Sequence, residues 1–390
     1  MAVYKIFPEK DATIYSLFPF MNTGVDEIVE ATTTTFAYDF SPQTSRTLMK
    51  FATPEITKVV ENVIGGWEQV GDIRLKLFIA TAEGLNDDTL IEVHPISGAW
   101  SMGTGKYLDD PISTNGCSWQ WYDFSGSNKW PLIPSLTNYV TTSMDPFGIG
   151  GGATWWYKNP QNEDTLSEYS QSINYADPAD LNFDVTSLVE IWYSSSKGIN
   201  NPGLDSINND GFIIKQAGKH EFVYTPDKAT ELKYFSIDTN TIYPPLMEFR
   251  WEDVSFDTGS SSHTIITDRD LVISLQDNPS TFRADSIYDF RINARPKYPA
   301  RVYQTASLYN INHYLPSESY YAIKDLDTNE FVIDFDDRFT QISADENSNY
   351  FRVYMNGLEP ERYYQILIKT LIGRDTLVLE SDLYFKVING

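Results

Sequence analysis

The sequence predicts an all-β protein with two sandwich domains, on the strength of three observations. Aromatic residues make up 14% of the 390 residues, and aromatic side chains fit a pleated, half-buried sheet better than a helix. Runs of alternating apolar and polar residues recur along the chain, as in strands with one buried face. Turn-forming residues separate these runs. Many short strands with few helices are typical of sandwiches and barrels.

Alternation of apolar and polar residues gives the positions of the expected strands. Leu75, Leu77 and Ile79 alternate with polar residues and fall on one face of a strand. The pattern recurs in later runs, at residues 247–251, 271–275, 331–335 and 364–368. Turn residues at 208–211 and 373–375 separate neighbouring strands and suit hairpins.

One segment has the period of a helix instead. Val185, Leu188, Val189 and Trp192 stand at positions i, i+3, i+4 and i+7, which makes one apolar stripe over two turns. Asp184, just before them, is a suitable N-cap. The sequence therefore predicts a short helix near residues 185–192, at one end of a sandwich.

The chain is long enough for more than one domain, because single hydrophobic cores stop growing near roughly 250–300 residues. Small polar residues from Asp257 to His263 interrupt the alternation and offer no apolar face to bury. We therefore expect an N-terminal domain over residues 1–257 and a C-terminal domain over residues 264–390.

Residues 100–178 differ from the rest of the chain, since tryptophans lie there among glycines and prolines. We expect long, aromatic-rich loops, which often carry function. Tryptophan side chains fill sandwich cores, anchor protein interfaces and stack against sugar rings. Core and interface roles are favoured over a sugar platform. The residues expected at an interface are Trp119, Trp121, Trp130, Trp155 and Trp156.

An ordered series of segments resembles the DNRLRE family, whose members are jelly-roll sandwiches akin to carbohydrate-binding modules. The matching segments are 11–14 with 22–24, 46–51, the strand at Leu75, Trp100, 183–189 leading to Trp192, 201–204, 211–214, 234–236 and 244–249. The resemblance covers residues 1–251 and implies a jelly-roll adhesion or display module. The chain departs from the family in having longer loops over 100–178 and no signal peptide.

The C-terminal part is similar to immunoglobulin and fibronectin type III sandwiches. Residues 351–366 carry this resemblance: a strand, a Gly-Leu-x-Pro corner at 357–360, and a second strand that begins with tyrosine. The resemblance implies that a tyrosine after the corner bonds through its hydroxyl to the preceding turn.

Charge and hydropathy exclude some functions. The chain has 54 acidic and 29 basic residues and a net charge of −25, whereas nucleic-acid binders need basic patches. No apolar stretch approaches the roughly 20 residues of a membrane span. The N-terminus lacks the apolar region of a signal peptide, so we expect synthesis and folding in a cytoplasm.

No catalytic residue and no cofactor are predicted. His94, His220, His263 and His313 lie far apart and lack metal-ligand spacing. The glycine cluster at 148–152 has no helix after it to bind a phosphate. Calcium is a further candidate ligand without an assigned site, because jelly rolls often carry it. Acid pairs that leave a glycan hydrolase open as an alternative occur at Asp87-Asp88, Asp109-Asp110 and Asp336-Asp337.

Adhesin-like sandwiches, cytoplasmic synthesis and the lack of a catalytic site together favour a non-enzymatic structural protein of a bacteriophage virion. We expect a tail, neck or fibre-attachment component, located in the virion and working as a homo-oligomer. Its partners would be other virion proteins with a basic docking face, because the chain is acidic. One alternative is a carbohydrate-binding module that contacts host glycans. A second is a polysaccharide-degrading enzyme.

Overall fold

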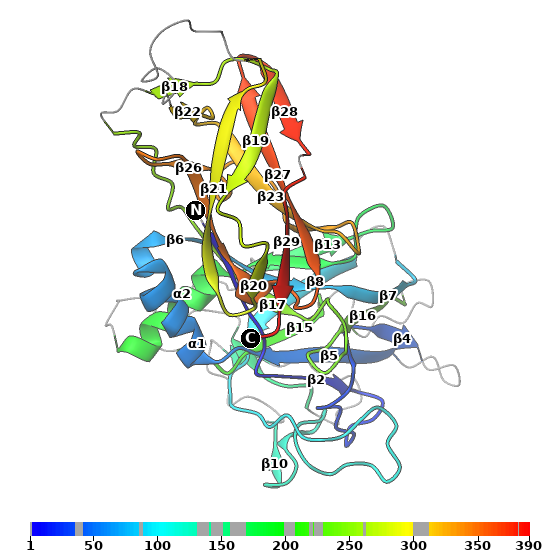
Figure 1. Ribbon diagram of the computed structural model, residues 1–390. Helices are drawn as coiled ribbons and strands as arrows, with labels where there is room; N and C mark the ends of the chain where they lie inside the picture. The colour runs from blue at the N-terminus through cyan, green and yellow to red at the C-terminus, as the bar shows by residue number, and fades with distance from the viewer. Residues whose placement is uncertain are drawn as a thin grey trace, which may run out of the picture. The chain divides into compact units, whose positions relative to one another are not determined.

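A computed structural model describes most of the chain, and it confirms the predicted all-β fold (Figure 1). The described residues are 2–35, 42–85, 89–130, 140–141, 151–156, 169–198, 207–217, 221, 229–259, 263–298, 312–380 and 382–390. The chain divides into two compact units. The C-terminal unit comprises Met1–Lys5, Glu68–Gly71 and Phe249–Gly390, and the N-terminal unit comprises Ile6–Trp67 and Asp72–Glu248.

The N-terminal unit is built from antiparallel sheets. One has the order β13-β8-β15-β5-β2, with β4 beside β5. Its strands are β2 (Lys10–Tyr15), β4 (Thr33–Thr35), β5 (Pro42–Lys50), β8 (Thr89–Pro95), β13 (Ser170–Ile173) and β15 (Phe212–Gln216). A second sheet has the order β3-β16-β7, formed by β3 (Ile28–Glu30), β16 (Glu231–Phe235) and β7 (Ile79–Glu83).

Shorter pairings complete this unit. Strand β14 (Leu181–Asp184) pairs with residues 74–77 of β6 (Val70–Leu77). The loops contribute two further antiparallel pairs, β9 (Trp121–Asp123) with β10 (Asn128–Lys129) and β11 (Val140–Thr141) with β12 (Trp155–Trp156). Strands β1 (Ala2–Ile6), β6 and β17 (Leu246–Trp251) each have residues in the ranges of both units.

The predicted helix near residues 185–192 is present as α2 (Thr186–Lys197). The Asp184 carboxylate accepts hydrogen bonds from the Thr186 N–H at 3.1 Å and the Thr186 hydroxyl at 2.7 Å. These bonds satisfy one donor at the helix start. The N-cap itself is Val185, one residue after the expected Asp184, and no side chain caps the helix in the usual way. The whole predicted stripe is buried, which explains why this face of the helix is apolar.

A second helical segment is missing from the sequence prediction. Helix α1 (Thr53–Lys58) continues into a π-helical stretch, η1 (Val59–Ile64), and a 3₁₀ turn follows, η2 (Trp67–Gln69). Pro54 in the first turn and Gly65 after the last are ordinary start and stop signals. The π-helical turn obscures the 3.6-residue period on which helix prediction depends.

The C-terminal unit is a sandwich with the strand arrangement of an immunoglobulin-like domain. One sheet has the order β19-β21-β26-β25 and the other β20-β29-β27-β23-β24, with β28 beside β27. The strands are β19 (Leu271–Gln276), β20 (Thr281–Arg283), β21 (Ile287–Pro296), β23 (Ser319–Asp325), β24 (Phe331–Ile333), β25 (Ser343–Ala344), β26 (Asn349–Tyr354), β27 (Tyr363–Ile372), β28 (Asp375–Leu379) and β29 (Tyr384–Ile388). Strands β18 (His263–Ile265) and β22 (Asn312–Tyr314) form a parallel pair, and a 3₁₀ turn, η5 (Met355–Gly357), follows β26.

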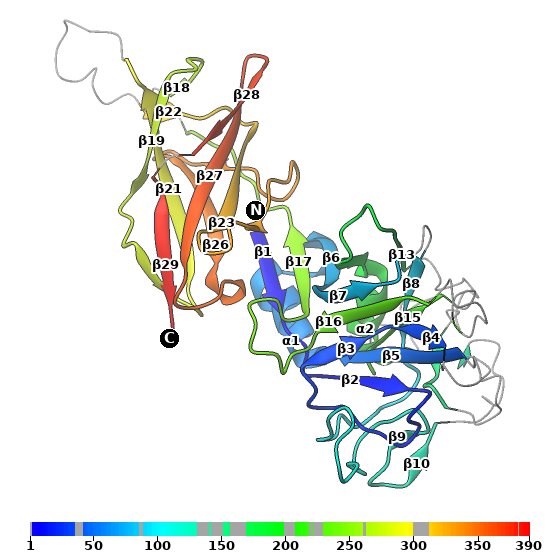
Figure 2. The same ribbon diagram turned by 90° about the vertical axis from the view of Figure 1, so that its right-hand side faces the viewer.

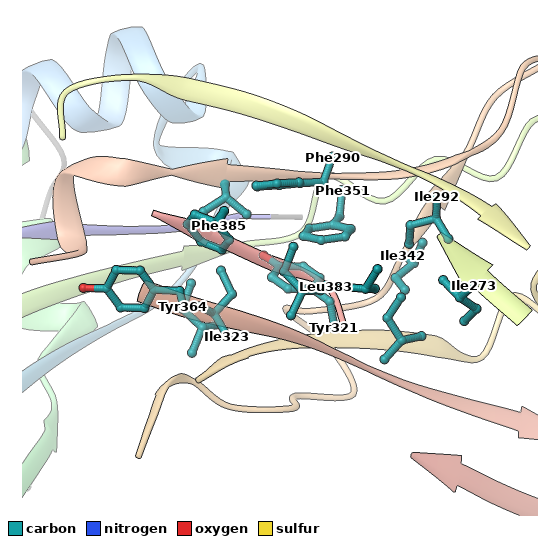
Figure 3. Packing of buried hydrophobic residues seen from close by; sticks show 14 of the residues in the cluster. Ile273, Phe290, Ile292, Tyr321, Ile323, Ile342, Phe351, Tyr364, Leu383 and Phe385 are labelled. Carbon is teal, nitrogen blue, oxygen red and sulfur yellow. The ribbon is translucent and has the colours of Figure 1, made fainter. Parts of the chain in front are cut away.

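Aromatic rings from both sheets meet in the core of this sandwich (Figure 3). Phe351 from β26 stacks on Tyr321 from β23, with ring centroids 4.2 Å apart. Phe290 from β21 lies 5.2 Å from Phe385 of β29. Burial of such rings is the main source of stability for a sandwich of this kind.

The expected tyrosine corner is present. The Tyr364 hydroxyl donates a hydrogen bond to the Glu359 carbonyl oxygen at 2.9 Å, within the turn that precedes β27. Tyr364 is the second tyrosine of the pair and is buried, whereas Tyr363 is exposed. The bond ties the turn to the strand that follows it.

The start of the chain belongs to the C-terminal unit. The Lys5 carbonyl oxygen accepts a hydrogen bond from the Asn356 side chain at 2.7 Å, and the Tyr4 ring lies 5.6 Å from the Tyr354 ring. The predicted linker begins at Asp257, inside the range of this unit, and its residues 260–262 lie outside the described part of the chain.

Candidate docking surface

The loops after β8 cover one face of the β13-β8-β15-β5-β2 sheet, and most of their tryptophans point inward. We call Trp100, Trp119, Trp130 and Trp155 the tryptophan layer. The buried cluster that contains them also includes Ala12, Ile14, Leu48, Ile96, Cys117, Ala153 and Ile213. Strands β2, β5 and β15 supply the sheet side of this cluster. The layer is thus a hydrophobic core in its own right.

The five tryptophans expected at an interface lie in two environments. Trp119, Trp130 and Trp155 are buried inside their own unit, so they have no surface to offer a partner. Trp121 and Trp156 are half-buried, and an interface role for them stays a prediction. Sequence alone could not separate the two groups, because irregular loops have no period that shows which side chains face inward.

A buried arginine lies against the tryptophan layer. Arg46 of β5 donates two hydrogen bonds to the Glu221 carboxylate, from Nε at 2.8 Å and from Nη2 at 3.0 Å. Its guanidinium carbon lies 4.8 Å from the ring centroid of Trp119 and 5.2 Å from that of Trp155. Arg46 also donates to the Gly152 carbonyl oxygen. One cation thereby holds the loops against the sheet.

Lysine and histidine extend this charged network. The Lys215 ammonium lies 2.9 Å from the Glu92 carboxylate and 3.9 Å from that of Glu221. His94 Nε2 lies 3.3 Å from the Glu92 carboxylate, and the His94 ring stacks on Trp155. The lysine, the histidine and Glu92 come from neighbouring strands, β8 and β15.

Burial and pairing decide the charges in the network. Burial disfavours the ionised form of Glu92, but hydrogen bonds from His94 and Lys215 outweigh this and lower its pKa to about 2. Burial lowers the pKa of His94, against the effect of its hydrogen bond to Glu92. Each charged group has an opposite charge beside it, and the tryptophan layer packs on the network. This arrangement suits a fixed structural support better than proton exchange with a substrate.

Exposed apolar side chains gather where the loop after β2 meets the loop before β9. We call this set the apolar patch. Its members, with the exposed fraction of each, are Leu17 (39%), Phe20 (48%), Tyr107 (45%), Leu108 (59%) and Ile112 (54%). In Figures 1 and 2 these loops lie beside β2, near β9 and β10. Exposed apolar side chains on neighbouring loops are typical of interaction sites.

Ring contacts and backbone bonds hold the apolar patch in place. The Tyr107 ring lies 5.2 Å from the Tyr15 ring and 6.0 Å from the Phe18 ring. The Phe20 ring meets Phe124 edge to face, at 6.5 Å. The Pro19 carbonyl oxygen accepts hydrogen bonds from the Gln120 N–H at 3.1 Å and the Ser118 hydroxyl at 2.9 Å.

Asn22 joins the two loops beneath the patch. Its amide nitrogen donates to the carbonyl oxygens of Met102 and Cys117, each at 2.7 Å. Its amide oxygen accepts from the Gly105 N–H at 2.8 Å. Gly103 has a φ of +85°, and a Cβ there would collide with the Asn22 amide. Glycine is therefore required where this backbone approaches Asn22.

Acidic side chains lie beside the apolar patch, next to Tyr107 and Lys106. We call Asp26, Glu27, Asp109 and Asp110 the acidic rim. Asp26 accepts a hydrogen bond from the Tyr107 N–H at 3.2 Å, and Lys106 lies 3.8 Å from Glu27. Burial raises the pKa of Asp26. The predicted acid pair at 109–110 thus lies at this surface. The sequence prediction does not include the patch residues. The available signal in the sequence was that apolar residues stand on both sides of Pro19.

A pocket of about 430 Å³ forms a second candidate site, where β13 and β14 come together. The residues that line it are Arg74, Tyr169, Ser170, Gln171, Asn182, Phe183 and Asp184. The Arg74 guanidinium lies 2.8 Å from Asp72 and 3.4 Å from Asp184, which balances its charge. The lining therefore suits an uncharged, polar ligand.

Asp336, Asp337 and His313 belong to the C-terminal unit. Asp336 accepts backbone hydrogen bonds within a turn, and Asp337 pairs with Lys369. His313 is half-buried in β22. The candidate positions that fall outside the described residues are His220, Asp87, Asp88 and residues 148–150.

Within the described residues, no three His, Cys, Asp or Glu side chains come together as a metal site requires. No described helix is long and apolar enough to cross a membrane. Comparison with known proteins adds no assignment: no protein-family model and no curated protein matches the chain.

Proposed function

We propose that this chain is a non-enzymatic structural component of a bacteriophage virion, which assembles through the apolar patch. The patch itself carries the proposal: exposed apolar side chains, held rigidly by Asn22 and by ring contacts, with acids beside them. Protein interfaces combine an apolar centre with a polar rim in this manner. A surface that is already ordered loses little entropy on binding.

The charged residues within the N-terminal unit support an assembly role over catalysis. Arg46, Lys215, Glu92 and Glu221 pair with one another under the tryptophan layer. Catalytic groups need access to a substrate and a pKa suited to proton transfer. The network instead strengthens the platform that carries the patch.

The acidic rim indicates the chemistry of the partner. Carboxylates beside the patch attract basic groups and repel acidic ones, which gives specificity and faster association. The partner surface should therefore have an apolar centre and basic side chains around it. A tail, neck or fibre-attachment protein with such a surface fits the proposal.

A substitution in the patch tests this function. Leu108→Asp places a charge at the most exposed patch residue, so we expect incorporation into purified phage particles to fall by roughly tenfold or more. Tyr175→Asp is the matched control, because Tyr175 is 76% exposed and lies outside the patch. Normal incorporation of the Leu108 variant, with an unchanged fold by circular dichroism, would contradict the proposal.

The pocket between β13 and β14 favours a second candidate function, binding of a surface glycan. Its volume of about 430 Å³ lies in the range of ligand pockets, roughly 300–1,000 Å³. Amide, guanidinium and carboxylate groups in the lining could bond sugar hydroxyls. A glycan array tests this: binding that is lost in Asn182→Ala supports it, and the absence of any binding excludes this candidate.

A further inference from the structure

The C-terminal unit carries basic and aromatic side chains on the outer face of its β20-β29-β27-β23-β24 sheet. Strand residues alternate between the two faces, and Tyr364, Ile366 and Phe385 point into the core. Their neighbours along β27 and β29 therefore face outward. A register shift in the β23–β24 pairing places Phe331 opposite Lys324, on the same outer face. We call the outward set Arg283, Lys324, Phe331, Tyr363, Tyr384 and Lys386 the basic face.

Strand register shows that the basic face is continuous. Tyr384 is paired with Gln365, which is paired in turn with Lys324, and Lys324 with Phe331. These residues form one row across β29, β27, β23 and β24, which are consecutive in the sheet. Figures 1 and 2 show β29, β27 and β23 side by side.

A second row lies beside the first. It is formed by Thr281, Lys386 and Tyr363, from β20, β29 and β27. Tyr384 of the first row and Lys386 of the second are two residues apart along β29, which separates the rows by about 7 Å. One partner surface can therefore contact both rows.

The charge of this face is opposite to that of the whole chain. Acidic residues outnumber basic ones by 54 to 29 over the sequence. Along the described strands of this sheet, the outward positions include Arg283, Lys324, Lys369 and Lys386 but no acid.

Acids from adjoining turns do reach the basic face. Glu361 pairs with Lys386, and Asp337 pairs with Lys369 at the far end of β27. Asp382 lies 3.4 Å from the Tyr384 hydroxyl. These acids lie at the edges of the face, and the strands between them present only basic and uncharged side chains outward.

The pairing with Glu361 does not remove Lys386 from binding. Exposed ion pairs contribute little to stability, so such a pair exchanges readily for a better one. The Lys386 ammonium also lies 5.7 Å from the Tyr363 ring, and that of Lys324 lies 5.9 Å from the Phe331 ring. Phe331, Tyr363 and Tyr384 are all exposed. The face thus combines apolar rings with positive charge.

We propose that the basic face of one copy of this chain binds the apolar patch and acidic rim of a second copy. The inference rests on the proposed assembly function and names its partner. Both surfaces expose aromatic side chains, and their charges are complementary. Two different surfaces make a head-to-tail contact, which leads to rings or open filaments.

Net repulsion between acidic copies does not prevent this contact. At physiological ionic strength the Debye length is about 8 Å, so distant charges are largely screened. Opposite charges that touch across the contact are screened much less, and they determine the pairing.

Mixing two full-length variants tests the proposal. The face variant carries Lys324→Glu and Lys386→Glu, and the patch variant carries Leu108→Asp. In sedimentation velocity, wild type should associate with rising concentration, and each variant alone should remain monomeric. An equimolar mixture should form dimers and nothing larger, because one intact face and one intact patch remain.

The controls separate this proposal from the proposed function. Lys297→Glu changes an exposed lysine elsewhere in the C-terminal unit and should associate as wild type does. Wild-type monomers at every concentration, self-association of the face variant, or a folded mixture without dimers would each overturn the copy-to-copy contact. Incorporation into phage particles tests the patch independently of self-association. If Leu108→Asp lowers incorporation and the face variant does not, the partner of the patch is another protein.

Discussion

Arg46 and Glu221 form a two-pronged ion pair in the N-terminal unit, although 175 positions separate them in the sequence. The side chains are 0% and 1% exposed. The pair connects a central strand, β5, to a distant loop, and Trp119 and Trp155 pack on the guanidinium. Charges removed from water in this way are stable only as long as both partners are present.

Removing one partner should therefore be costly. We expect Glu221→Ala to lower the free energy of unfolding by about 3–5 kcal/mol, because the Arg46 charge stays buried without its carboxylate. Urea denaturation followed by tryptophan fluorescence measures the effect. The double variant Arg46→Met with Glu221→Leu should recover much of the loss. A change below about 1 kcal/mol in Glu221→Ala would show that the pair is not a structural support.

The pH dependence of stability should reveal the ionisation of Asp11. Burial raises its pKa to about 7, although its carboxylate accepts the Ile237 N–H at 2.9 Å. The folded state then holds this proton more tightly than the unfolded chain does. The stability contributed by protonation is present at low pH and is lost as pH rises through 7.

Asp11→Asn removes the ionisation and keeps a hydrogen-bond acceptor. Its stability advantage over wild type should grow from about pH 4 to about pH 7 and then level off, at about 4 kcal/mol. Urea denaturation at several pH values measures this difference. A difference that does not vary with pH would refute the assignment to Asp11.

His94 should act in the opposite direction. Burial lowers its pKa, so the unfolded chain binds the proton more readily and stability falls as pH drops below about 6.5. Between about pH 7.5 and about pH 5.5, His94→Gln should lose less stability than wild type. Equal losses in the two proteins would exclude His94 as the titrating group.

The tyrosine corner allows a closely matched test. Tyr364→Phe deletes the hydroxyl that binds the Glu359 carbonyl oxygen, so we expect a loss of about 1–2 kcal/mol in the free energy of unfolding. Tyr363→Phe changes the neighbouring, exposed ring and should stay within about 0.5 kcal/mol of wild type. Equal effects of the two variants would show that the bond does not stabilise the turn.

Local patterns in the sequence were sufficient for strands β17, β19 and β27, helix α2 and the tyrosine corner. Each has a period or a motif that lies within a few residues. The run at Leu75, Leu77 and Ile79, expected as one strand, is divided between β6 and β7, which lie in different sheets. The segment of α1 and η1 was not predicted as a helix, because η1, its second half, is π-helical. The docking surface could not be predicted for another reason. Asn22 and Met102 are 80 positions apart, and only the fold brings them together.

The direction in which a loop tryptophan points was equally inaccessible to sequence reasoning. Trp119 and Trp121 are two positions apart, yet one is buried and the other is half-buried. In a regular strand, residues two apart share a face. The loop does not keep that period here. Composition therefore showed that the segment is rich in tryptophan, but not which of its side chains remain exposed.

The salt dependence of self-association should show whether copies of the chain attract one another or only repel one another less when their charges are screened. If the basic face binds the acidic rim, self-association must weaken from low to high salt, because the attraction is screened. If copies only repel one another, their net charge of −25 predicts stronger association as salt rises. Sedimentation velocity across a salt series measures the sign. The face variant supplies the control: without its lysines it should lose the salt-sensitive attraction. Association that strengthens with salt in wild type and face variant alike would leave the apolar patch as the sole attractive surface, and the basic face without a part in assembly.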